Sequence, residues 1–219
     1  MVSQKHGISA LGLKQALGLK SYQTTWLLMH KLRRAMVRPG RDRLVGPVQV
    51  DETYMGGPRP GKRGRGAAGK TLVVIAVEDR GKRFGRIRLH KVKDASALSL
   101  VPVVKESVQP NSKVHTDGWD GYSKLSSSGY KHTVIRKTAD VGENLLPFAN
   151  RVAALLKRWL LGTHQGSPRP SHLEYYLDEF VFRFNRRTCR SRGKLFYRLI
   201  QQAVQIEPIK GEEISGRPR

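Results

Sequence analysis

The feature that most constrains the fold is a near-continuous run of β-branched and other apolar residues at Thr71–Val77 (TLVVIAV). Such a run predicts a buried β-strand. Alternation of apolar and polar residues predicts a strand before it, at Val45–Tyr54, and another after it, at Phe84–Val92. Gly81 lies between the second and the third of these segments, so we expect those two strands to form a hairpin.

Shorter strands and several helices follow this meander. Strands are predicted at Val114–Trp119 and His132–Arg136. Ser171–Glu174 (SHLE) has the pattern of a capping box. Helices are expected at residues 95–108 with Asp94 as the cap, and at 144–161, 173–184 and 195–204. This order of elements indicates the α/β class and fits an RNase H-like topology, a mixed five-stranded sheet with flanking helices.

The chain is expected to divide into three parts. Residues 1–42 are predicted to be helical, with Gly18 between two short helices and Ser21 as the N-cap of the second. This pair resembles a helix-turn-helix that binds DNA, although most helical pairs are simply packed helices. Residues 43–206 are the expected catalytic domain, and residues 207–219 are the expected disordered tail.

Composition indicates a polyanionic partner. The chain has 41 Lys and Arg against 17 Asp and Glu, a formal net charge of +24. A protein this basic attracts nucleic acid, although a generic RNA-coating protein would have the same charge. The single cysteine, Cys189, excludes an intramolecular disulfide and a Cys-rich zinc site. No apolar run approaches the roughly 18 residues of a membrane span, and there is no signal peptide, so we expect a soluble, cytoplasmic protein without a membrane partner.

Gly64–Thr71 (GRGAAGKT) matches a phosphate-binding P-loop in letters but not in context. A P-loop needs a strand before it and a helix N-terminus after it, whereas here a Gly/Pro/Arg stretch comes before and a β-branched strand after. We therefore expect no nucleotide cofactor. The segment is instead predicted to be a basic loop near phosphate backbone, and its candidate DNA-binding residues are Arg59, Lys62, Arg63 and Arg65.

Two aspartates lie at the ends of predicted strands, Asp51 after Val48-Gln-Val and Asp117 in VHTDGW. A carboxylate at the end of an apolar strand needs a partner or a metal, because burying an isolated charge is costly. Two such aspartates on neighbouring strands can share one Mg²⁺ or bridge two ions about 3.5–4 Å apart. Asp51 taken alone would better suit a surface strand end paired with Arg or Lys. Glu52 points to the opposite face and is expected to be structural.

Four segments resemble the insertion-sequence transposases of the ISXO-like group. VDETYMGG at residues 50–57 looks like their first-aspartate motif, and HTDGWDGY at 115–122 looks like the second. LLKRWLLGTH at 155–164 is similar to the segment after their third catalytic position. YLDEFVFRFNRR at 176–187 is similar to their C-terminal signature. The resemblance extends from about Ile8 to Val204.

The resemblance implies a DDE-type transposase that cleaves DNA and transfers strands at the ends of an insertion sequence, using Mg²⁺ or Mn²⁺, with two ions. Asp51 and Asp117 would then be metal ligands. The third position holds Asn150 where a DDE enzyme has Glu, and Lys157 follows seven residues later on the same helix face, as a phosphate contact. Asn150 as a residue without a metal, and Glu143 as a rival third ligand, remain open.

The resemblance also implies partners and further contacts. Element ends and target DNA are the expected partners, with a homo-oligomer assembled on DNA. Lys157, Arg158 and His164 are candidate DNA contacts. An N-terminal zinc ribbon, common in the family, is not expected with one cysteine. A catalytically inactive, truncated DNA-binding relative and a nuclease of the same fold are the alternatives.

Several other residues are expected to have structural roles. His115 shares a strand face with Asp117, but it is predicted to be a core or phosphate-facing imidazole rather than a metal ligand. Asp178 and Glu179 are expected to pair with Arg183 and its neighbours. The tryptophans are expected to be packing residues rather than base-stacking platforms; they are Trp26, Trp119 and Trp159.

Overall fold

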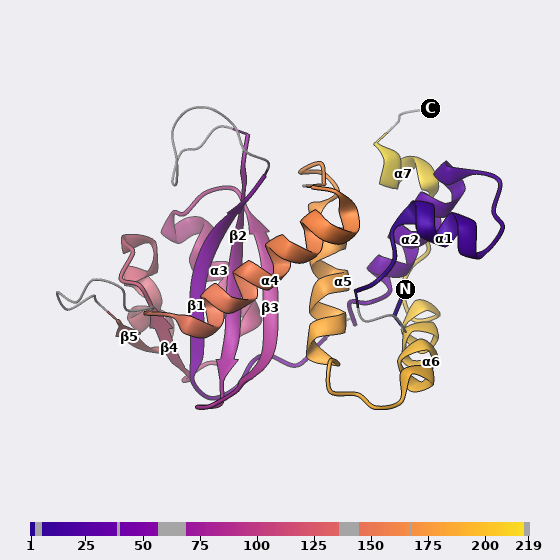
Figure 1. Ribbon diagram of the computed structural model, residues 1–219. Helices are drawn as coiled ribbons and strands as arrows, with labels where there is room; N and C mark the ends of the chain where they lie inside the picture. The colour runs from indigo at the N-terminus through magenta and orange to yellow at the C-terminus, as the bar shows by residue number, and fades with distance from the viewer. Residues whose placement is uncertain (3–5, 39, 57–68, 136–144, 167, 217–219) are drawn as a thin grey trace. The chain divides into compact units, whose positions relative to one another are not determined.

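The computed structural model describes residues 1–2, 6–38, 40–56, 69–135, 145–166 and 168–216 (Figure 1). The chain forms two compact units, one made of Asp42–Arg158 and the other of Met1–Arg41 together with Trp159–Arg219. This division differs from the expected domain boundaries, because helices after residue 158 pack with the N-terminal helices. The two units are called the sheet unit and the helical unit below.

The sheet unit contains a five-stranded mixed sheet in the order β3-β2-β1-β4-β5. β1, β2 and β3 form an antiparallel meander, β4 is parallel to β1, and β5 is parallel to β4. The predicted α/β class and mixed five-stranded sheet are therefore confirmed. The strands are β1 (Val48–Met55), β2 (Thr71–Asp79), β3 (Phe84–Val92), β4 (Lys113–Thr116) and β5 (Lys131–Val134).

Helices lie on both faces of this sheet (Figure 1). α3 (Ala97–Ser107) covers one face, and α4 (Pro147–His164) begins on the other. β2 is buried from Leu72 to Glu78, as its apolar run predicted. The core between the sheet and α3 also includes η1 (Asp120–Ser128), a 3₁₀ helix. This core consists mainly of Val48, Val50, Val74, Ala76, Leu100, Val104, Tyr122 and Leu125.

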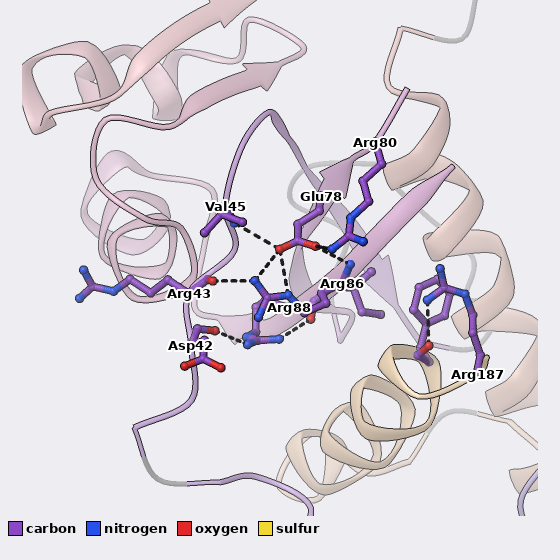
Figure 2. Close-up of polar contacts among 10 residues, drawn as sticks. Asp42, Arg43, Val45, Glu78, Arg80, Arg86, Arg88 and Arg187 are labelled. Carbon is purple, nitrogen blue, oxygen red and sulfur yellow. Dashed lines mark hydrogen bonds and ion pairs between the residues drawn. The ribbon is translucent and has the colours of Figure 1, made fainter. Parts of the chain in front are cut away.

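The segment that enters β1 is fixed by a buried carboxylate, that of Glu78 (Figure 2). Arg86 donates to Glu78 Oε1 from Nε at 2.9 Å and from Nη2 at 2.7 Å. The Val45 N–H donates to the same oxygen at 3.2 Å, and Arg80 donates to Oε2 at 3.0 Å. Burial alone would raise the pKa of Glu78, but the hydrogen bonds and the charge of Arg86 outweigh burial and lower it. Arg86 also donates to the Arg43 carbonyl, so β2 and β3 together hold the chain just before β1.

The helical unit is built around α2 and α5. Ser21 caps α2 as predicted, accepting from the Thr24 N–H at 3.2 Å. Arg33 on α2 and Glu179 on α5 form a fully buried ion pair with a 2.8 Å Nε–Oε2 distance, and Arg183 is 3.8 Å from the same carboxylate. The helices are α1 (Ala10–Ala16), α2 (Tyr22–Arg34), α5 (Leu173–Asn185), α6 (Arg192–Ala203) and α7 (Gly211–Ser215).

Three local expectations differ from the structure. The N-cap of α5 is His172 and makes no side-chain capping bond, so the capping box expected at Ser171 does not form. Ser96 rather than Asp94 is the N-cap of α3, and Asp94 Oδ1 instead accepts from the Ser96 N–H at 3.0 Å. The expected disordered tail contains α7, whose Ile214 is buried. Among the described helices, none has both the length and the apolar character needed to cross a membrane.

Replacing Glu78 with Ala is expected to lower the free energy of unfolding by about 3 kcal/mol, because Arg86 would be left without its buried partner. Thermal or urea denaturation of the full chain measures this loss. Arg80→Ala is the matched control, since the Arg80 side chain is 63% exposed and its pair should contribute less than about 1 kcal/mol. Equal effects of the two substitutions would show that the network does not fix the entry to β1.

Candidate active site

The sheet brings the two predicted aspartates level with each other. β1 and β4 are parallel neighbours, with Val48 opposite Val114 and Gln49 opposite His115. Continuing this register by two residues places Asp51 opposite Asp117, which directly follows β4. Neighbouring strands lie about 4.8 Å apart, and side chains level with each other share a face of the sheet. The parallel pairing of β1 with β4 is the arrangement on which the predicted aspartate pair depends, and a shared cation stays a prediction.

A sharp turn holds Asp117 at the end of its strand. Gly118 has φ +88°, a left-handed conformation that favours glycine. One carboxylate oxygen of Asp117 accepts from the Trp119 N–H at 3.0 Å, and the Trp119 indole Nε1 donates to the Ala95 carbonyl at 2.7 Å. A Cβ on Gly121 would lie only 2.4 Å from that carbonyl, so the chain is closely packed here. The DGWDG sequence thus fixes the position of Asp117 through its backbone.

Gln49 connects the sheet to the beginning of α4. It precedes Asp51 by two residues on β1, so both side chains point to the same face. The buried Gln49 Oε1 accepts from the Phe148 N–H at 3.0 Å and the Ala149 N–H at 3.4 Å, two amides of the first turn of α4. Its Nε2 donates to Asp79 at 3.0 Å. The first turn of α4 is therefore anchored on the face of the sheet that carries Asp51.

α4 carries the third predicted ligand and the predicted lysine. Asn150 is in the first turn and is exposed, next to the buried Ala149. Lys157 is exposed on the same helix face, since seven residues make almost two full turns. Arg151 and Arg158 are also exposed on this helix. α4 therefore presents an amide close to its anchored start and a series of cationic side chains along its exposed side.

The opposite face of β1 also concentrates negative charge at this end. Tyr122 is fully buried, and its hydroxyl donates to Glu52 at 2.9 Å, which gives Glu52 a structural partner. Burial raises the pKa of Tyr122 well above its usual value, and the charge and hydrogen bond of Glu52 raise it further. Asp51 and Asp117 act in the same direction, so all three carboxylates lie near this phenol.

The donor set fits a divalent cation with hard oxygen ligands. Mg²⁺ takes oxygen ligands from few protein carboxylates and obtains the rest from water and substrate phosphate. Two level aspartates and an amide on α4 supply that type of ligand, and the accumulated negative charge favours a cation. Within the described ranges, no three His, Cys, Asp or Glu side chains form a metal site on their own. A site made of two aspartates and an asparagine differs from these, because one of its three ligands is an amide oxygen.

Other predicted residues lie elsewhere or outside the described residues. Arg59, Lys62, Arg63, Arg65 and Glu143 fall in segments that the structure does not describe. His115 is half-buried, its Nε2 has no hydrogen-bond partner among the described residues, and burial lowers its pKa.

His164 belongs to the helical unit. Its ring lies 4.6 Å from that of Trp159 and 4.8 Å from that of Tyr176. Burial lowers its pKa to about 3, so the imidazole is neutral at physiological pH. The predicted DNA contact of His164 stays a prediction, and a neutral ring can supply hydrogen bonding or stacking but not charge.

Two residues of the site were not identified from the sequence alone. Gln49 is a polar residue between two valines, two residues before Asp51. That spacing places both side chains on one face of the strand and could have indicated that Gln49 belongs to the site. Tyr122 is part of the HTDGWDGY motif, but nothing in its spacing indicated that it contacts Glu52. Both residues orient the site, one by anchoring α4 and the other by holding Glu52.

Comparisons with known proteins identify relatives of this chain. The model of the family described as the ISXO2-like transposase domain matches residues 43–185. An uncharacterized transposase-like protein of Haemophilus influenzae is 28% identical over 119 residues, covering 52% of this chain and 92% of that protein.

A distant likeness to a solved structure also exists. It is to a chain in the cryo-EM structure of the simian T-cell lymphotropic virus intasome in complex with PP2A regulatory subunit B56 gamma. The TM-score is 0.36 and the sequence identity is 13%. The match covers 78% of this chain but only 60% of that one.

Replacing Gln49 with Ala is expected to leave two N–H groups of α4 without an acceptor and to destabilise the sheet unit by about 1–3 kcal/mol. Amide hydrogen exchange at Phe148 and Ala149 should accelerate by roughly tenfold or more. Gln109→Ala is the matched control, because Gln109 is exposed. Unchanged protection of the two α4 amides would show that Gln49 does not anchor the helix.

Proposed function

The chain belongs to the ISXO2-like transposase family, and on that basis we propose that it cleaves DNA and transfers strands at the ends of an insertion sequence in a metal-dependent reaction. The family match covers residues 43–185, which include all of the sheet unit except its first residue. A DNA-processing enzyme is therefore the starting point. The metal-dependent cleavage and strand transfer, and the residues that carry them out, are what we propose.

The observation that carries the proposal is the parallel pairing of β1 with β4, whose register, continued two residues past the last pair, would put Asp51 level with Asp117. Opposed carboxylates repel each other unless a cation lies between them. The start of α4 is anchored on the same face of the sheet through Gln49. This anchor supports the proposal that the Asn150 amide binds the same cation. We assign Asp51 and Asp117 as metal ligands and Asn150 as the neutral third ligand.

Mg²⁺ or Mn²⁺ at this position would activate water or a 3′-hydroxyl and stabilise the leaving oxygen, with two ions as the expected complement. The protein's own part is to hold the ligands and the DNA. With Asn150 in place of a carboxylate, the ligand set carries two negative charges rather than three. A less negative ligand set repels the DNA phosphate less.

Cationic side chains would hold the DNA beside these ligands. Lys157 is assigned to a phosphate of the strand being cut, and Arg158 and Arg151 lie on the exposed side of the same helix. The basic residues in the sequence between β1 and β2 are proposed to contact the DNA backbone; they are Arg59, Lys62, Arg63 and Arg65. Phosphate contacts of this kind position DNA without reading its sequence.

The helical unit is proposed to supply further DNA contacts. Gln23 and Thr24 are exposed at the N-terminal end of α2, the end that contacts base edges in a helix-turn-helix. Paired element ends would be bound by a homo-oligomer. A DNA-bound dimer or larger assembly is the expected active form.

Asp51→Asn and Asp117→Asn are each expected to reduce Mg²⁺-dependent nicking and joining of DNA carrying element ends by at least about 100-fold. Loss of several kcal/mol of metal-supplied stabilisation costs a factor of ten for each 1.4 kcal/mol or so. Asp120→Asn is the matched control, because Asp120 is exposed and lies three residues after Asp117.

The parent chain separates the alternatives in the same assay. Cleavage without joining would identify a nuclease, and DNA binding without cleavage would identify an inactive relative. Full activity in either Asp51→Asn or Asp117→Asn would rule out the assigned ligand pair.

The third ligand is tested by comparing Asn150→Ala with Glu143→Ala. We expect Asn150→Ala to lose activity and to need a higher Mg²⁺ concentration for half-maximal rate, whereas Glu143→Ala keeps the parent's metal dependence. Asn150→Asp should retain activity, because a carboxylate preserves an oxygen ligand at that position. Inactive Glu143→Ala beside active Asn150→Ala would transfer the assignment to Glu143.

A further inference from the structure

Two cavities of the helical unit adjoin the same aromatic rings. One has a volume of about 330 Å³ and the other about 310 Å³, the small end of the range for ligand pockets. Both are lined by Tyr22 and Trp26 of α2 and by Tyr176 of α5. The three rings therefore stand between two spaces, each large enough to accept a flat ring system.

The remaining lining is mostly cationic or polar, with Ala10, Leu11 and Pro168 as its apolar members, and lacks carboxylates. Arg33 and His164 line one cavity, and Arg169 and His172 line the other. No Asp or Glu is among the described residues that line either cavity. His164 also has an Nε2 atom with no hydrogen-bond partner among the described residues. A ligand with an aromatic ring, hydrogen-bonding edges and a negative charge matches this lining.

Two of the three rings, those of Trp26 and Tyr176, are held in place before any ligand arrives. The Trp26 ring makes edge-on contacts with the rings of His30 and His172, with centroids 4.1 Å and 5.0 Å apart and interplanar angles of 60° and 82°. The Arg33 guanidinium lies 4.0 Å from the centre of the Tyr176 ring. Arg33 is itself fixed by its buried ion pair with Glu179. Because these rings need little ordering on binding, a stacked ligand would lose less free energy to conformational entropy.

We propose that these two cavities bind unstacked nucleobases of single-stranded DNA, with Trp26 and Tyr22 as the stacking rings. The proposal rests on DNA being the substrate, but it requires neither the metal nor catalysis. Single-stranded DNA is commonly bound by aromatic rings that stack on bases next to cationic groups that contact phosphate. The formal charge of +24 favours a polyanion over a free neutral ligand. Trp26 would then be more than the packing residue that its sequence context suggests.

The test measures DNA affinity in EDTA, so it is independent of strand transfer. A single-stranded oligonucleotide containing 2-aminopurine, whose fluorescence reports stacking, is titrated with the full-length chain, and a duplex of the same sequence is titrated in parallel. Tyr22→Ala is the main variant, because Tyr22 is 52% exposed and its removal should leave the fold intact. Tyr197→Ala, on the 64% exposed Tyr197 of α6, is the matched control.

Loss of a stacking ring should weaken single-strand binding by roughly tenfold while changing duplex affinity by less than about twofold. Trp26→Ala should do the same, and Trp26→Phe should restore most of the affinity if the protein only needs a ring there. The Tyr197→Ala control should match the parent on both DNA forms.

Three results would overturn the proposal. Equal losses for single-stranded and duplex DNA would indicate that the rings only support the fold or the surface charge. Unchanged single-strand affinity in Tyr22→Ala and Trp26→Ala would show that the cavities do not hold bases. Binding of free dAMP with the same affinity per site as the oligonucleotide would assign the cavities to a free nucleotide instead.

Discussion

The geometry of the candidate site depends on one buried amide, that of Gln49. It reaches three elements at once: it belongs to β1, donates to Asp79 at the end of β2, and accepts two N–H groups from the start of α4. A buried amide that satisfies partners on three elements restricts how each of them can move, because leaving any partner unpaired is costly. Asp51 on β1 and Asn150 on α4 therefore both lie close in sequence to residues that the Gln49 amide joins.

Successive side chains of β1 point to opposite faces of the sheet, so one face packs against the core and the other carries the candidate site. Val48 and Val50 face the core beneath α3, whereas Gln49 and Asp51 face α4. A shift of one residue in register would bury Asp51 among apolar side chains and expose the valines. The network around Glu78 opposes such a shift by fixing the chain just before β1. Stability of the sheet and placement of the proposed metal ligands therefore depend on the same register.

Most of the sheet could be predicted from the sequence, because its signals are local. The apolar run at 71–77 and the alternation at 84–92 correspond to β2 and β3. Asp117 directly follows β4, as its motif predicted, but Asp51 lies inside β1 rather than at its end, because β1 continues to Met55. The division into units could not be predicted, because it depends on pairs distant in the sequence, such as Arg33 with Glu179. The capping box at Ser171 was wrong because the helix begins later, after His172. Gln49 was missed because its partners on α4 lie about a hundred residues away.

The fixed indole of Trp119 gives the sheet unit an optical property that follows from its bonding. Of the three tryptophans, Trp26 and Trp159 belong to the helical unit, so Trp119 is the sole indole of the sheet unit. Its backbone N–H is bonded to Asp117 and its ring nitrogen to the Ala95 carbonyl. A displacement of the Asp117 carboxylate would act on the backbone of the residue that carries this indole. The emission of Trp119 is therefore expected to respond to such a displacement, in a chain whose helical-unit tryptophans have been replaced by phenylalanine.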